Sequence, residues 1–151
     1  MSDDLIKATA KALPNTNLKE ATCEPISLSG TDRSYYRINL NNDQSLIVME
    51  YTTDRPDNAK FAAATNTLKR LGVAAPEILS HDSKKQFIWM EDLGTQHLWD
   101  HRDAKWDERS ALYKSVIDES RKFHAGNEQT LKKEELTQLE PSFDESLYKW
   151  E

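Results

Sequence analysis

Two histidines are the residues in this sequence whose spacing best suits metal chemistry. His97 and His101 are four positions apart, which would place both imidazoles on one face of a helix, and Asp100 and Asp103 are nearby. A metal site needs further ligands, and no third residue has a reason to converge on this pair. We therefore interpret the segment as a solvated loop or short helix and expect no metal site.

The other candidates for nucleophilic or acid–base chemistry are Cys23 and His124. Cys23 lies in a polar stretch with no histidine beside it, so nothing in its neighbourhood indicates a nucleophile. His124 falls on the inner face of a predicted helix, where a histidine is more often a hydrogen-bonded core residue. A single cysteine also excludes an internal disulfide and a cysteine-cluster metal site.

The composition indicates a globular protein with a strongly solvated surface. The 151 residues include 20 Lys and Arg against 26 Asp and Glu, a net charge of −6, which argues against a general nucleic-acid binder. No apolar run approaches the ~18 residues of a membrane span. Asp3 and Asp4 stand where a signal peptide would be basic and then apolar. We expect a soluble, cytoplasmic protein with no nucleic-acid or membrane partner.

Hydrophobic periodicity divides the chain into helices and strands of an α+β fold. The clearest feature is a hairpin, because residues 34–40 alternate, residues 45–52 form an apolar run, and Asn41-Asn42-Asp43-Gln44 supplies turn chemistry between them. A further strand is predicted over residues 87–91, FIWME. Helices are predicted over 2–13, 57–71 and 103–125, followed by a polar irregular stretch over 126–142 and the start of another helix over 143–151.

Three stretches in this order resemble one family. They are GTDRSYYRI at 30–38, SLIVMEY at 45–51, and LGVAAPEIL at 71–79 with FIWMEDLG at 87–94. Together they are similar to the N-terminal lobe of the aminoglycoside phosphotransferase and choline kinase-like small-molecule kinases. The closest members are bacterial kinases of cell-wall amino sugars, which phosphorylate N-acetylmuramate or N-acetylglucosamine. The resemblance covers about residues 20–125.

The resemblance implies two lobes. Residues 1–93 would be a protein-kinase-like nucleotide-binding lobe, a small antiparallel sheet with one packed helix. Residues 94–151 would be the exit from the hinge and an incomplete helical C-terminal lobe. In the complete enzyme this lobe would bind ATP and Mg²⁺, and the missing part of the C-terminal lobe would bind the small-molecule substrate.

The resemblance also assigns a nucleotide site. Residues 29–34 would cover the phosphates, and 90–93 would be a hinge whose Glu91 C=O and Leu93 N–H pair with the adenine edge. Without the resemblance these segments would be a polar turn and a strand end before a glycine turn. The implied nucleotide contacts are Ser29, Gly30, Thr31, Asp32, Arg33, Ser34, Glu91, Asp92 and Leu93.

The sequence departs from the family pattern at the phosphate-binding lysine. Kinases of this fold place a Lys on the third strand and pair it with a Glu on the next helix. Here Met49 or Glu50 occupies the Lys position, and residues 57–71 contain no Glu. The absence of both the Lys and the Glu is physically consistent, because losing only one of them would leave an unpaired charge in a partly buried site. The candidates for a replacement cation are Arg33, Arg37 and Lys60.

The catalytic machinery of the family is absent from these residues. His101-Arg102-Asp103 matches the catalytic-loop triplet of protein kinases, but it precedes the long helix that should come before that loop. Glu108 stands where Asn is required, and no Asp-x-Asp follows. We reject the triplet as a catalytic loop and interpret Asp103 and Asp107 as acids at the helix start.

Three interpretations follow. The first is the ATP-binding portion of a small-molecule kinase that phosphorylates a hydroxyl of an amino sugar or related molecule, and it would be inactive alone. The second is a non-catalytic binding or scaffold module derived from such a lobe. The third is a soluble α+β domain whose resemblance is accidental. A lobe without its partner should also expose apolar surface on the helix over 105–125.

Overall fold

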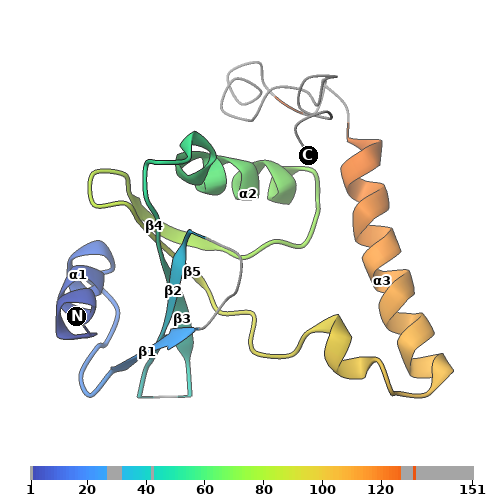
Figure 1. Ribbon diagram of the computed structural model, residues 1–151, viewed down its shortest axis with the longest axis horizontal. Helices are drawn as coiled ribbons and strands as arrows, with labels where there is room; N and C mark the ends of the chain where they lie inside the picture. The colour runs from blue at the N-terminus through green and yellow to red at the C-terminus, as the bar shows by residue number, and fades with distance from the viewer. Residues whose placement is uncertain (1, 27–31, 42, 127–130, 132–151) are drawn as a thin grey trace.

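The structure is a computed structural model, and it describes residues 2–26, 32–41, 43–126 and 131 (Figure 1). The helix expected over 143–151 and nearly all of the polar stretch over 126–142 lie outside the described residues. The strands are β1 (Thr22–Ile26), β2 (Ser34–Asn39), β3 (Ser45–Glu50), β4 (Ile78–Asp82) and β5 (Phe87–Glu91). The helices are α1 (Ser2–Ala12), α2 (Phe61–Arg70) and α3 (Trp106–Ala125), with short 3-10 helices η1 (Pro56–Lys60) and η2 (Leu98–His101).

All five strands pair antiparallel in the order β1-β2-β3-β5-β4. The predicted hairpin is confirmed, since β2 pairs with β3 in a register that places Ser34 opposite Glu50. Its turn is closed by the Leu40 N–H, which donates to the Gln44 carbonyl at 2.7 Å. Asp43 has a φ of 55°, a left-handed conformation that Asn and Asp tolerate better than most residues. The α+β fold built on a small antiparallel sheet is therefore as the sequence predicts.

Strand β3 is apolar from Leu46 to Met49 because both of its faces are covered. Leu46 and Val48 pack on one face with Leu5 of α1, whereas Ile47 and Met49 pack on the other face in a separate cluster. Each such side chain contributes about 1.5–3 kcal/mol when fully buried. A strand buried on both faces loses the polar alternation that β2 retains, which explains the continuous run at 45–52.

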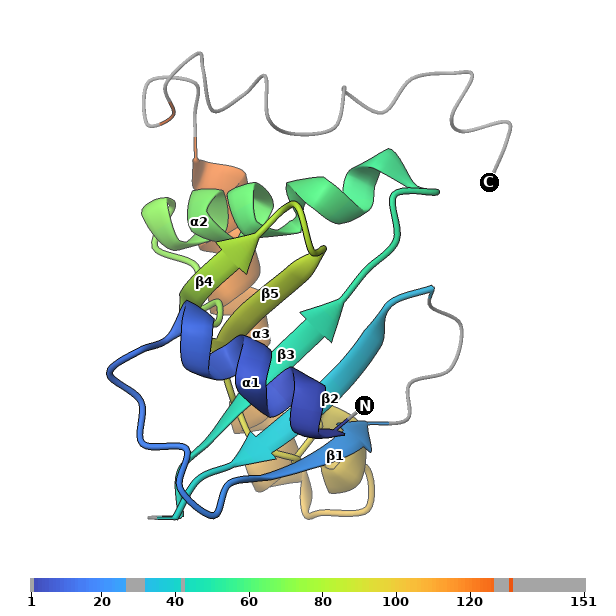
Figure 2. The ribbon, with the colours of Figure 1, turned by 90° about the vertical axis from the view of Figure 1, so that its left-hand side faces the viewer.

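Two helices pack on the sheet, where the sequence predicts one. Helix α1 lies across the face opposite α2, and Figure 2 shows it in front of the strands with α3 behind them. Besides Leu5, it buries Thr9 in a polar contact: the Trp89 indole N–H donates to Thr9 Oγ1 at 2.8 Å, and the Thr9 hydroxyl donates to the Leu5 carbonyl at 2.8 Å. A threonine in this role carries no apolar signal, so periodicity shows only a modest stripe.

Helix α2 occupies the position between β3 and β4 that the sequence predicts, with η1 as its first turns. It buries Ala62, Thr65 and Thr67, and the Thr65 and Thr67 hydroxyls donate to carbonyls four residues back. The helix ends at Arg70, and Gly72, two residues later, has a φ of 78° that permits the reversal that a residue with a side chain would resist. A glycine just beyond the last turn is a common way for a helix to end.

Helix α3 stands apart from the sheet and contains no buried residue (Figure 1). It meets the rest of the molecule near its C-terminal end, where Glu119 accepts from the Ala74 N–H at 2.8 Å and the Leu71 side chain lies against Gly126. Among the described helices, none is long and apolar enough to cross a membrane. The exposed large apolar side chains of α3 are Trp106, Tyr113, Val116, Ile117 and Phe123. They form the apolar surface that the sequence predicts a lobe without its partner to expose.

Candidate functional site

A small pocket lies on the α2 face of the sheet, where β5 runs into the connection to η2. We call it the hinge pocket. Its volume is about 300 Å³, at the lower end of what small-ligand sites occupy. Much of its wall is apolar, and Ile47 and Met90 contribute from the two central strands. The other lining residues are Ile26, Tyr35, Arg37, Pro76, Glu91, Asp92, Leu93, Gly94, Thr95 and His97.

The backbone at the mouth of the hinge pocket is tied to the start of β4. The Glu91 N–H donates to the Glu77 carbonyl at 2.9 Å, and Glu91 Oε2 accepts from the Glu77 N–H at 3.0 Å. Leu93 is 69% exposed, and its N–H has no hydrogen-bond partner among the residues that the structure describes. A fixed strand end thus leads into a backbone donor that a ligand can reach.

Asp92 holds the hinge to β2 and β3. The Arg37 Nε donates to Asp92 Oδ2 at 2.5 Å, Arg37 Nη2 donates to Oδ1 at 3.1 Å, and the Ser45 hydroxyl donates to Oδ2 at 2.6 Å. The Gly94 N–H adds a fourth donor at 2.8 Å. Because these donors favour the ionised carboxylate, with the Arg37 hydrogen bond the largest cause, the pKa of Asp92 falls from 3.8 to about 2.

This geometry limits what Asp92 and Arg37 can offer a ligand. The Asp92 side chain is 5% exposed and the Arg37 side chain 18%, so the pair is largely removed from water. Arg37 Nη2 also donates to the Gly94 carbonyl at 3.3 Å. Both side chains are therefore engaged in positioning the backbone of residues 92–94 against the sheet.

The described part of the predicted phosphate loop is held by Asn58. Asn58 is fully buried: its Oδ1 accepts from Arg33 Nε at 2.7 Å, and its Nδ2 donates to Asp32 Oδ2 at 3.1 Å and to the Thr52 carbonyl at 3.1 Å. Arg33 also pairs with Asp57 at 3.3 Å. The Asn58 hydrogen bond is the main reason that the pKa of Asp32 lies below its usual value. The Asn58 side chain, which belongs to η1, thus forms hydrogen bonds with both Asp32 and Arg33.

The structure brings only part of the sequence-predicted site together. Ser29, Gly30 and Thr31 lie outside the described residues. Glu91, Asp92 and Leu93 line the hinge pocket, whereas Asp32, Arg33 and Ser34 do not. Lys60, half-buried at the end of η1, is likewise not among the lining residues.

The lysine position of the family is filled by packing. Met49 is fully buried in the apolar cluster with Ile47, Ala62 and Met90. Glu50 accepts a hydrogen bond from the Tyr36 hydroxyl at 3.3 Å, and desolvation, with the Glu50 charge second, raises the pKa of Tyr36. Neither residue presents a charge to the hinge pocket.

The histidines and the cysteine show no catalytic arrangement. His101 Nδ1 lies 3.1 Å from Glu108 Oε1, and the Asp103 side chain is 86% exposed. Burial is the main reason that the pKa of the Cys23 thiol rises, which disfavours the reactive thiolate. Among the described residues no group of three His, Cys, Asp or Glu side chains could hold a metal ion.

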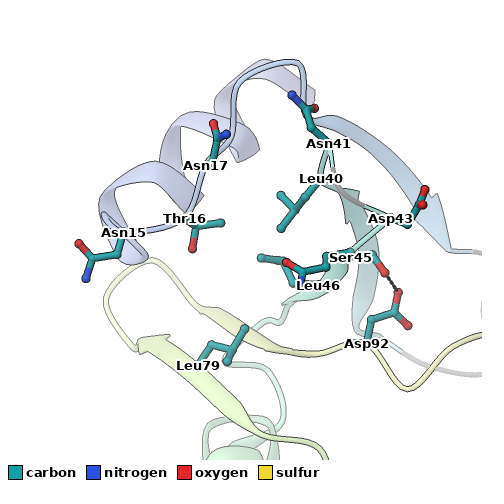
Figure 3. Close-up of a pocket in the computed structure, with 11 residues that line it drawn as sticks. Asn15, Thr16, Asn17, Leu40, Asn41, Asp43, Ser45, Leu46, Leu79 and Asp92 are labelled. Atoms are coloured by element: carbon teal, nitrogen blue, oxygen red, sulfur yellow. Dashed lines mark hydrogen bonds between the residues drawn. The ribbon is translucent and has the colours of Figure 1, made fainter.

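A second, larger pocket lies on the α1 face of the sheet, and sequence reasoning missed it. We call it the outer pocket; its volume is about 760 Å³ (Figure 3). Polar residues from two connections form its rim: Asn15, Thr16 and Asn17 after α1, and Asn41, Asp43 and Gln44 between β2 and β3. Ser45 and Asp92 also line it, so Asp92 belongs to both pockets. Each connection is visibly rich in asparagine, but nothing local indicates that the two meet.

Comparison with known proteins gives a weak structural likeness. No protein-family model matches the chain, and a search of curated proteins finds no relative. Among solved structures, the chain is similar to a Thermobifida fusca protein named "putative fructosamine-3-kinase", with 16% sequence identity and a TM-score of 0.45. The match covers 64% of this chain and 33% of that protein. A likeness of this size supports no functional assignment, so any assignment rests on the geometry of the hinge pocket and on the sequence motifs.

Proposed function

We propose that this chain is the ATP-binding portion of a small-molecule kinase and that the adenine ring binds in the hinge pocket. The observation that carries the proposal is an apolar slot closed on one side by a backbone segment with an accessible donor. Ile47 and Met90, which are cross-strand neighbours, would contact one face of the ring, and the Leu93 N–H would donate to a ring nitrogen. An apolar pocket with a few placed polar groups is the usual design of a cofactor site.

The arrangement of elements supports this assignment. The strands follow the order β1-β2-β3-β5-β4, and α2 is inserted between β3 and β4. In protein kinases a loop between the first two strands covers the nucleotide phosphates, and residues 29–34 would correspond to that loop here. Residues 1–93 would form this lobe, and 94–151 would begin the second one.

The proposal assigns distinct roles to the predicted site residues. Ser29–Ser34 would face the nucleotide phosphates, and Mg²⁺ would arrive bound to those phosphates. Asn58 would hold Asp32 and Arg33 in place. Arg37 would act through Asp92 to position the hinge instead of binding phosphate, since its guanidinium is already paired.

Phosphoryl transfer itself would need residues that this sequence does not contain. The acceptor would be a hydroxyl of an amino sugar or related molecule bound by further helices. We accordingly expect no ATP-dependent sugar phosphorylation by the 151-residue chain, and measurable turnover would contradict this assignment.

A thermal shift experiment tests nucleotide binding. At 10 mM MgATP and a Kd of about 0.1 mM, binding adds about 2.7 kcal/mol to the free energy of unfolding, or about 5–10 °C in Tm. Magnesium tripolyphosphate, which has the charge without the base, should give no comparable shift. Leu93→Asp should weaken the ATP effect because it places a carboxylate at the pocket mouth. Val116→Asp on α3 is the matched control, since Val116 is also exposed and is not among the residues that line the pocket.

One observation favours a non-catalytic binding or scaffold module instead. Met49 is fully buried where a kinase has its phosphate-binding lysine, so the lobe has no cation at that position. A chain that shows no stabilisation by MgATP or MgADP at 10 mM would support the scaffold and contradict the nucleotide site.

A further inference from the structure

The apolar walls of the outer pocket and the hinge pocket lie on opposite faces of the sheet, and Asp92 lines both pockets. Leu46 and Leu40 belong to the core on the α1 face, whereas Ile47 and Met90 belong to the core on the α2 face. A ligand that rests on the leucines of the outer pocket would therefore lie across the sheet from an adenine ring on Ile47 and Met90. Any function of the outer pocket is additional to the proposed kinase function.

The rim of the outer pocket offers hydrogen-bonding groups that the fold does not use. The side-chain amides of Asn15 and Asn41 make no hydrogen bond to other described residues, and both are exposed. Asn17 uses its Oδ1 to accept from the Lys19 N–H at 3.1 Å, which leaves its NH₂ available. Each free amide can donate and accept at once, so the rim matches a ligand with several hydroxyl or amide groups.

The charge of the outer pocket excludes anionic ligands. None of the residues that line it is a Lys, Arg or His. The Asp43 carboxylate has no ion-pair partner among the described residues, and Asp92 is neutralised by Arg37. A phosphate or carboxylate in this pocket would lose its hydration without gaining a cation, whereas an ammonium group would gain Asp43.

The floor of the outer pocket is apolar. Leu40, Leu46 and Leu79 line it between the two polar connections, as Figure 3 shows, and Leu79 is 42% exposed. The Leu79 side chain thus offers apolar surface to a ligand. A ring that is apolar on one face and carries hydroxyls around its edge matches such a floor and rim.

We infer that the outer pocket binds a neutral or amino-bearing saccharide. Its hydroxyls would bond the amides of Asn15 and Asn41, its C–H face would lie on the leucine floor, and an amino group would face Asp43. The volume of about 760 Å³ leaves room for a monosaccharide or a disaccharide.

Titration of the isotope-labelled full chain, followed by the amide signals of residues 15–17 and 41–46, tests this inference. The probes are glucose, glucosamine, maltose and glucose 6-phosphate. We expect saturable shifts with glucosamine and with at least one neutral sugar, and weaker or no binding of glucose 6-phosphate. Failure of all three unphosphorylated sugars, or tightest binding of the phosphate, would overturn the inference.

Two substitutions at exposed positions sharpen the test. Asp43→Asn keeps a residue type that tolerates a φ of 55° and removes the charge, so it should abolish the preference for glucosamine over glucose. Asn41→Ala should weaken all sugars by about fivefold through loss of hydrogen bonds. Asp118→Asn on α3 should change nothing. Equal binding by Asn41→Ala, Asp43→Asn and the unmodified chain would place the sugars elsewhere. Nucleotide binding is read at Met90, Leu93 and Gly94, which line the hinge pocket and not the outer pocket, so the two proposals fail independently.

Discussion

Replacing Asp92 by Asn tests the network that holds the hinge. The carboxylate accepts from Arg37, Ser45 and the Gly94 N–H, and its side chain is 5% exposed. Lowering its pKa from 3.8 to about 2 corresponds to about 2 kcal/mol of folding free energy, at about 1.4 kcal/mol for each tenfold change in proton affinity. Asp92→Asn should therefore lower the free energy of unfolding by about 2–3 kcal/mol at pH 7.

The pH dependence distinguishes this mechanism from a general packing defect. The folded-state pKa of Asp92 lies below the unfolded one, so its contribution is complete above about pH 5 and disappears as the pH falls towards 2. The difference between the two chains should shrink over that range, because a protonated Asp92 is also uncharged.

Urea unfolding at a series of pH values, followed by far-UV circular dichroism, measures this difference. Asp118→Asn is the matched control, because Asp118 forms an exposed pair with Arg121 at 3.6 Å and should change stability by less than about 0.5 kcal/mol. In a double-mutant cycle, Arg37→Met with Asp92→Asn should cost less than the sum of the single changes. A difference that stays constant down to pH 2, or no difference at pH 7, would refute the reasoning.

Two further substitutions test the two faces of the core. Met49→Lys places a cation in a fully buried position that faces a helix without an acidic residue, so it should destabilise the chain by about 3 kcal/mol or more and should not create a phosphate site. The control Met49→Leu should cost under about 1.5 kcal/mol, and a stable Met49→Lys chain would contradict the packing. Thr9→Val leaves the buried Trp89 N–H without its acceptor, so urea unfolding should show that the free energy of unfolding falls by about 1–3 kcal/mol. The control Thr53→Val, at an exposed position, should show no such loss, and equal stability of the two variants would exclude this hydrogen bond.

Elements defined by local patterns were predictable from the sequence. The hairpin of β2 and β3, helix α2 with its Gly72 end and strand β5 all follow from periodicity and turn residues. Helix α3 begins at Trp106, three residues after the predicted start, because a turn follows η2 in which the Ala104 N–H donates to the His101 carbonyl. The packing of α1 was not predictable, since its central contact is a hydrogen bond between Thr9 and Trp89, 80 residues apart.

The candidate site was less predictable than the fold. The sequence indicates Glu91–Leu93 as a hinge only through a family resemblance, and the structure places these residues on the hinge pocket. The pairing of Arg37 with Asp92 spans 55 residues, and no local pattern distinguishes it from an exposed strand arginine. The buried Asn58 was missed for the same reason: a polar residue at a helix start gives no sign of the loop that it holds.

Amide mapping with MgADP tests the central claim most directly. In the labelled full chain, millimolar MgADP should shift the amide signals of Ile47, Met90, Leu93 and Gly94, which line the hinge pocket, and leave those of Asn15 and Asn41 in the outer pocket unchanged. The largest change should occur at Leu93, because its N–H would gain a hydrogen bond to adenine. Shifts confined to other parts of the chain, or none at 10 mM MgADP, would contradict a nucleotide site at the hinge.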